Sequence, residues 1–191
     1  LADYSSEIAS KLALAKVYLL SMKPEKAIAL LKNNTVESIY ENQIKLINAE
    51  AHLLSEKYEE AINYYSSFFE ESYPDASVLN RYLLAFKKTS NLKGAKVAFE
   101  TLQEKYPNNI EVGLMRANIQ IFSGKPKLAV DFVNSLTVKA QQHYLSQGVK
   151  GKAMYHMKQF NDALPLLLES YKKSQNSELI IYIFHTLIKL N

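Results

Sequence analysis

Four histidines are the side chains in this sequence with the clearest potential for metal or acid–base chemistry: His52, His143, His156 and His185. Two histidines bind zinc from one helix when they stand at i and i+4, and no pair here has that spacing. An isolated histidine on a helix more often packs or forms a hydrogen bond. We therefore expect His52 to be a half-buried packing residue and His156 to lie at the surface, and we predict no metal site.

Carboxylates occur in two adjacent pairs, Glu59/Glu60 and Glu70/Glu71. Acid–base catalysis uses two carboxylates whose environments differ inside a cleft, whereas neighbours on a helix surface are most simply solvated charges. The sequence has no cysteine nucleophile and no Gly-x-Ser-x-Gly motif, and its five glycines are too dispersed for a phosphate-binding loop. We predict a protein that is not an enzyme and uses no cofactor.

Thirteen tyrosines and a net charge of +4 raise the question of a nucleic-acid surface. Arginine forks are the usual readers of phosphate and guanine, yet the chain has only Arg81 and Arg116, and its lysines are scattered. The aromatic cluster at residues 64–69 has the one-turn spacing of a helix interior. The prediction is therefore that no nucleic acid is bound.

The elements that would position these side chains follow from an internal repeat. Alanines recur at intervals of 34 residues, and each is followed four positions later by a large apolar residue. The residue twelve positions before each alanine is small in four of the five copies. The alanines are Ala27, Ala61, Ala95, Ala129 and Ala163; the large residues are Leu31, Tyr65, Phe99, Val133 and Leu167; the preceding residues are Ala15, Ala49, Leu83, Ala117 and Gly151.

An interval of this length accommodates two helices of about 14 residues and two short turns. A small residue on each helix allows the pair to pack at the short end of the usual ~8–10 Å interaxial distance, and the large residue fills the space beside it. The turn residues agree. Pro24 and Pro126 suit a first helical turn, Gly124 suits a left-handed helix end, and Tyr73-Pro74-Asp75 separates two units.

These residues resemble the tetratricopeptide repeat (TPR) family, with the best match between Ala95 and Pro107. The resemblance implies an all-α protein: a right-handed α-solenoid of stacked antiparallel helix pairs, with about five units and one extra C-terminal helix. Leu83 replaces the small residue of the pattern, so we expect its helix pair to stand slightly farther apart. Pro165 lies inside a predicted second helix, where it costs a hydrogen bond unless the helix starts late, and we predict a distorted first turn there.

Counting in steps of 34 predicts one solenoid domain over residues 1–191, with units near 8–41, 42–75, 76–109, 110–143 and 144–177 and a half unit at 178–191. The half unit contains an apolar run from Leu179 to Phe184. It is either a cap helix with one apolar face on the fifth unit, or an interior helix whose hairpin partner is missing, as in a fragment of a longer repeat protein. We favour the second interpretation. An exposed apolar face there would promote self-association.

A finer resemblance concerns residues 123–185. The segments Ser123-Gly-Lys-Pro126, Gly151-Lys-Ala153 and 177–185 are similar to the terminal repeats of long bacterial TPR lipoproteins associated with exopolysaccharide and PEP-CTERM sorting systems. This resemblance implies an envelope location and a role in assembly or export. A chain without cysteine fits the cytoplasm and equally the bacterial periplasm, including an outer-membrane-anchored protein. No apolar run approaches the ~18 residues of a membrane span.

First helices line the concave face of such an array, and their second, fifth, ninth and twelfth residues form the binding stripe. We predict a partner-binding groove made of Lys16, Gln43, Glu50, Asn80, Leu84, Lys87, Asn118, Lys152 and Tyr155. A stripe that mixes apolar residues with single polar ones suits an extended peptide or a partner helix. The lysines favour an acidic or neutral partner, unless they only keep the groove solvated.

The function predicted is therefore a non-catalytic protein–protein interaction scaffold. Family members that hold chaperone tails place Lys at the fifth and Asn at the ninth position of one first helix. Here Leu12 and Lys16, or Leu114 and Asn118, stand there instead, so chaperone-tail capture is not predicted. The alternative is a cell-envelope TPR protein that serves exopolysaccharide assembly or PEP-CTERM-type protein sorting. Aromatic residues in the groove would favour sugar binding, and Tyr155 is the only one among the predicted groove residues.

Overall fold

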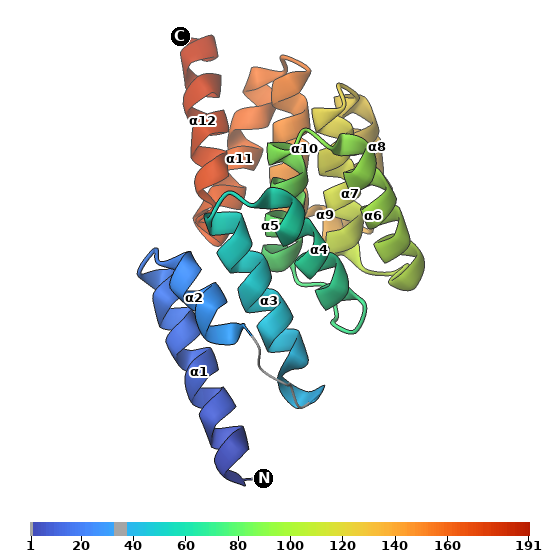
Figure 1. Ribbon diagram of the computed structural model, residues 1–191. Coiled ribbons are helices and arrows are strands. Elements are labelled where there is room, and N and C mark those ends of the chain that lie inside the picture. The colour runs from blue at the N-terminus through green and yellow to red at the C-terminus, as the bar shows by residue number, and fades with distance from the viewer. Residues whose placement is uncertain (1, 33–37) are drawn as a thin grey trace. The chain divides into compact units, whose positions relative to one another are not determined.

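The computed structural model describes residues 2–32 and 38–191, and over these residues its regular elements are α-helices (Figure 1). The predicted all-α class is therefore confirmed. Contacts group the chain into two compact units, Leu1–Ala98 and Phe99–Asn191. The single-domain organisation, the exact repeat units and the right-handed superhelix stay predictions. The end of the first predicted repeat, residues 33–37, lies outside the described residues.

Over its described residues, the first unit contains five helices and the beginning of a sixth. Helix α1 packs on α2 and α3 packs on α4 as hairpins, while contacts from α2 to α3 and from α4 to α5 join successive helices. The helices are α1 (Ala2–Leu20), α2 (Pro24–Leu31), α3 (Ser38–Leu54), α4 (Tyr58–Phe69), α5 (Ala76–Lys88) and α6 (Leu92–Lys105), of which α6 continues into the second unit.

The second unit has the same arrangement of hairpins, α7 with α8 and α10 with α11, and α12 then packs on α11 (Figure 1). A one-turn helix, α9, joins the two hairpins and was not predicted. Thr137 begins it by accepting a hydrogen bond from the backbone N–H of Ala140 at 3.4 Å. The helices are α7 (Ile110–Phe122), α8 (Pro126–Ser135), α9 (Val138–Gln141), α10 (Tyr144–His156), α11 (Phe160–Ser174) and α12 (Ser177–Leu190).

The residues of the 34-residue pattern form the interior, as the packing argument requires. All five repeating alanines are fully buried, and the large residue after each of them is buried as well. Gly151 shows why a small residue stands twelve positions before each repeating alanine. A Cβ atom on Gly151 would lie 2.9 Å from Cγ of Leu167 and 3.2 Å from its backbone nitrogen. The α10–α11 hairpin thus depends on a contact that even alanine would crowd.

The turn inside each helix pair has one conformation, repeated five times. The second residue after the first helix has a positive φ of 54° to 74° in every copy: Met22, Glu56, Ser90, Gly124 and Lys158. The next backbone N–H returns to the helix, as when Lys57 donates to the carbonyl of His52 at 2.8 Å. This hydrogen-bond pattern satisfies the last carbonyls of the helix. We predicted the left-handed end at Gly124; the four non-glycine copies carried no such signal.

Two further local predictions have different outcomes. The Tyr73-Pro74-Asp75 boundary is confirmed as a helix start, because Asp75 accepts hydrogen bonds from the backbone N–H groups of Ser77 (2.9 Å) and Val78 (3.4 Å). The distorted first turn near Pro165 is wrong. Helix α11 begins at Phe160 and continues through the proline, which as the sixth residue deprives only the carbonyl of Asn161 of its helical donor.

Candidate functional site

A pocket of about 370 Å³ opens on the first unit between α1, α3 and α5, each the first helix of its predicted repeat. The eight residues that line it belong only to these helices. They are Lys16, Leu19, Leu20, Gln43, Leu46, Ile47, Glu50 and Arg81.

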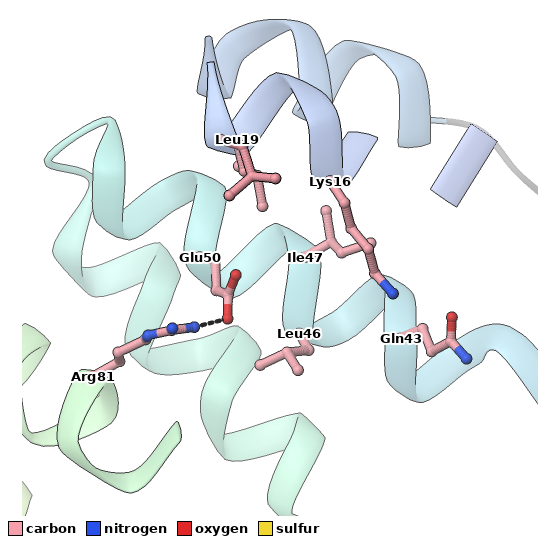
Figure 2. A pocket seen from close by; sticks show the side chains of 8 residues that line it. Lys16, Leu19, Gln43, Leu46, Ile47, Glu50 and Arg81 are labelled. Carbon is pink, nitrogen blue, oxygen red and sulfur yellow. Dashed lines mark hydrogen bonds and ion pairs between the residues drawn. The ribbon is translucent and has the colours of Figure 1, made fainter. Parts of the chain in front are cut away.

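The pocket has an apolar centre between two polar sides. Figure 2 shows Leu46 between Lys16 and Gln43 on one side and an ion pair on the other. That ion pair joins the Arg81 guanidinium of α5 to the Glu50 carboxylate of α3. Polar groups at separate points around an apolar centre can fix the direction of a bound segment, while the centre supplies the affinity.

Helix periodicity explains why these side chains converge. The α3 residues Gln43, Leu46, Ile47 and Glu50 stand at i, i+3, i+4 and i+7, which places them on one face of the helix. Ile47 is also buried in the core cluster that includes residues of α1 and α2. The wall of the pocket is therefore the outer edge of the core, and its shape is held by the same packing that holds the hairpins together.

Three of the predicted groove residues, Lys16, Gln43 and Glu50, are brought together here. Three others lie on α5 of the same unit and do not line the pocket. The Asn80 amide donates to its own helix, at the carbonyl of Ala76 (2.8 Å). The Leu84 side chain is exposed and that of Lys87 is half-buried.

Two of the three predicted groove residues of the second unit are buried. Lys152 is only 5% exposed, and its ammonium lies 3.5 Å from the Glu178 carboxylate of α12. Asn118 is buried, with its amide nitrogen 3.9 Å from the sulfur of Met115. The prediction that these two side chains face the groove is therefore corrected: neighbouring side chains cover them. Tyr155 is half-buried.

Five of the eight pocket residues were not among the predicted groove residues. Leu19 and Leu46 stand at positions of the stripe, whereas Leu20, Ile47 and Arg81 stand beside those positions. The signal that could have identified Arg81 is its charge, because it is one of only two arginines and follows Glu50 by 31 residues. In a 34-residue repeat, two residues 31 positions apart lie close to each other on successive first helices.

The histidine and the carboxylates whose chemistry the sequence raised have ordinary helix surroundings. His52 is buried, its ring centroid lies 5.1 Å from that of Tyr64, and its Nδ1 lies 2.9 Å from the carbonyl oxygen of Asn48. Glu59 and Glu60 are exposed. Among residues 2–32 and 38–191, no group of three or more histidines and carboxylates is arranged to hold a metal ion.

None of the helices described is both long enough and apolar enough to cross a membrane.

A second polar cluster lies between α10 and α12. The rings of Tyr155 and Tyr182 pack edge to face with centroids 5.2 Å apart, and His156 Nε2 lies 3.5 Å from the Tyr182 hydroxyl. Burial, reinforced by Glu178 and Tyr155, raises the pKa of Tyr182 to about 12. His156 is exposed, as predicted. Partial desolvation and the nearby Lys152 ammonium lower its pKa. These contacts attach α12 to α10.

Comparison with known proteins supports the fold. No protein-family model matches the sequence, and no curated protein matches it significantly. Among solved structures, the chain is similar to the crystal structure of a thermophilic TPR protein from Thermus thermophilus. The TM-score is 0.65 at 12% sequence identity, over 94% of this chain and 98% of that one. Similarity at this identity shows the fold alone: an all-α, TPR-like helical repeat.

Proposed function

We propose that this chain is a non-catalytic protein-interaction scaffold that binds a segment of a partner protein in the pocket on α1, α3 and α5. The observation that carries the proposal is the pocket itself, with an apolar centre and separate polar groups on three helices of the first unit. A TPR-like fold is consistent with such a role, because stacked first helices present side chains to an extended partner.

The dimensions of the pocket suit a few side chains of a protein segment. Its volume of about 370 Å³ lies near the lower end of the ~300–1,000 Å³ of small-molecule sites. A few side chains of a peptide or helix would fill it. Leu20, which is 86% exposed, and Leu46 supply apolar surface that such side chains would remove from water. Burial of that kind contributes about 25 cal/mol per Å².

The charges of the pocket indicate the character of the partner. Glu50 and Arg81 compensate each other. Lys16 is exposed, and no ion pair to it is formed by the residues that the structure describes. The pocket therefore carries one uncompensated cation. An acidic or neutral partner segment is favoured, because a basic segment would meet like charge in a partly dehydrated site.

Two matched substitutions on α1 test the proposal. Leu20 and Val17 are both exposed apolar residues of this helix, and only Leu20 lines the pocket. In a pull-down from an extract of the source cells, a specific partner should be retained by wild type and by Val17→Lys and lost by Leu20→Lys. All three proteins should have the same helical circular dichroism. A partner recovered equally with Leu20→Lys would refute binding at this pocket.

The alternative function, a cell-envelope protein for exopolysaccharide assembly or protein sorting, depends on the resemblance of residues 123–185. Carbohydrate sites usually offer aromatic faces for stacking, yet the pocket lining contains no aromatic residue. Tyr155, the one aromatic residue of the predicted groove, packs against Tyr182. We therefore propose the scaffold function.

A further inference from the structure

The two cations of the pocket stand on opposite sides of its apolar centre. Lys16 comes from α1 and Arg81 from α5, with Leu46 of α3 between them (Figure 2). A partner segment with one carboxylate beside an apolar side chain could therefore be placed in two ways, with its carboxylate at either cation. The two placements differ in free energy only if the two cations differ in what surrounds them.

Glu50 makes the Arg81 side of the pocket electrically neutral. Its Oε1 forms an ion pair with Nη1 of Arg81, and the two side chains, which both line the pocket, are 25% and 46% exposed. A partner carboxylate that approached Arg81 would also meet the negative charge of Glu50, and this repulsion would offset the attraction. Displacing Glu50 instead would leave it without a counter-ion in a partly dehydrated site. Arg81 is therefore a poor receptor for a carboxylate.

The Lys16 side of the pocket keeps its positive charge. Lys16 is exposed, and among residues 2–32 and 38–191 no carboxylate forms an ion pair with it. Gln43 lies on the same side (Figure 2), and its side-chain amide forms no hydrogen bond with the part of the chain that the structure describes. The ammonium and the amide are both hydrogen-bond donors, so a carboxylate is the group that this side is equipped to receive.

The carboxylate of Glu50 is a property of α3 and is not required by the repeat. Glu50 is the one acidic residue among the eight that line the pocket. The same repeat position holds Lys16, Leu84, Asn118 and Lys152 in α1, α5, α7 and α10. Helix packing alone therefore does not demand a carboxylate here, whereas the neutralisation of Arg81 does.

We propose that the pocket holds its partner segment in one orientation, with a carboxylate of the partner on the Lys16–Gln43 side and an uncharged part of the segment on the Glu50–Arg81 side. Glu50 determines this orientation because it neutralises the second cation. Resting on the proposed binding of a protein segment here, the orientation defines the chemistry of that segment: an acidic residue near an apolar one, with no second acidic residue on the far side.

Short peptides test this orientation. A phage-displayed library of random peptides is selected on wild type, and the sequences that do not bind Leu20→Lys are kept as ligands of the pocket. These peptides should carry an Asp or Glu near an apolar residue. Fluorescence anisotropy then compares one such peptide with its amide version, which has Asn for Asp or Gln for Glu. Wild type should bind the acidic peptide about threefold to fivefold more tightly, and Lys16→Met should bind the two equally.

Glu50 is tested with a peptide that has a second acidic residue on the other side of the apolar one. Wild type should gain nothing from the added charge, because Arg81 is already neutralised. Glu50→Gln should bind this peptide about threefold to fivefold more tightly than the peptide with one acidic residue, since Arg81 is then available. The matched control is Glu41→Gln, which removes an α3 carboxylate that pairs with Lys45 at 2.8 Å outside the pocket and should behave as wild type.

The outcomes distinguish the orientation from the proposed function. Leu20-dependent peptides without an acidic residue, or an acidic peptide whose advantage survives in Lys16→Met, would overturn the orientation and leave the pocket as a binding site. A Glu50→Gln variant that is helical by circular dichroism and gains nothing from the second acidic residue would overturn it as well. A library that yields no Leu20-dependent peptide would refute both the orientation and the binding of a protein segment at this pocket.

Discussion

Lys16 and Lys152 occupy the same position of the repeat and have opposite surroundings. Lys16, in the first unit, is exposed and lines the pocket between α1, α3 and α5. Lys152, in the second unit, is buried, and its ammonium lies 3.5 Å from Glu178. The residue 26 positions further along the chain differs: Glu178 follows Lys152, whereas Asn42 follows Lys16.

This difference shows that a repeat position determines where a side chain lies on its helix and leaves its role open. The next first helix decides that role. When it presents a carboxylate and covers the lysine, the cation becomes part of the packing. When it presents an amide and leaves the surface open, the cation remains available to a ligand. In the pocket, therefore, the next first helix presents no carboxylate to the charge of Lys16.

The largest expected effect comes from removing the buried lysine. Lys152→Ala should destabilise the protein by about 2 kcal/mol, because Glu178 loses its partner and the packed lysine stem is deleted. Lys16→Ala should change the free energy of unfolding by less than about 0.5 kcal/mol. Urea denaturation measures both. Equal losses in the two variants would contradict the distinction between a structural and an available cation.

A second prediction concerns a feature that both units share. Glu56 and Lys158 have φ values of 60° and 62°, in the left-handed region that disfavours residues with a Cβ atom. Glu56→Gly and Lys158→Gly should each stabilise the protein by about 0.5–1 kcal/mol. Thermal unfolding should show a raised midpoint for both variants. A loss of stability in either one would show that its side chain makes a contact worth more than the backbone strain.

The difference between the two lysines can also be reduced by substitution. Asn42→Glu gives Lys16 the carboxylate that Lys152 has, 26 residues along the chain. A double-mutant cycle of Asn42→Glu with Lys16→Ala should give a favourable coupling of about 0.5 kcal/mol, the usual value of a solvent-accessible ion pair. Asn42→Glu should also weaken binding of an acidic partner segment. Zero coupling would show that the two helix faces do not bring these residues together.

The smallest expected effect is on the titration of His156. Its pKa is lowered in the folded protein by partial desolvation and by Lys152, while Tyr155 and Tyr182 are its neutral ring neighbours. A folded pKa below the unfolded value of 6.5 means that the unfolded chain binds the proton more readily. Stability from this group is therefore present above pH 6.5 and declines as the pH falls below it.

NMR titration of the His156 ring measures this directly. Lys152→Met keeps much of the buried stem and removes the ammonium, so it should raise the pKa of His156. Lys16→Met, the matched change in the first unit, should leave that pKa unchanged. A His156 pKa that does not rise in Lys152→Met would show that desolvation alone lowers it.

The helix pairs could be predicted from sequence because their interior depends on a few residues at one spacing. The repeating alanines and the large residue after each of them are visible without a structure, and all are buried. The turns were harder. Only Gly124 has a residue type that reports its left-handed conformation, whereas Met22 and Ser90 adopt it because the surrounding hairpin imposes it.

The candidate site was predictable only in part, since it depends on how each helix is rotated about its axis. The stripe rule identified Lys16, Gln43 and Glu50 and missed Arg81, whose ion pair with Glu50 requires the particular rotation of α5 against α3. The rule also assigned Lys152 to an open groove. Whether the following helix covers a given lysine depends on three-dimensional packing that the spacing of residue types does not record.

The most direct test of the pocket as a binding site is NMR mapping of the partner segment identified by the pull-down. The segment is titrated into isotope-labelled protein, and backbone and methyl shifts are followed. We predict that the largest shifts occur at Lys16, Leu20, Leu46 and Glu50, and that Leu20→Lys abolishes them. Largest shifts on the second helices α2 and α4, or on α12, would contradict binding at this pocket.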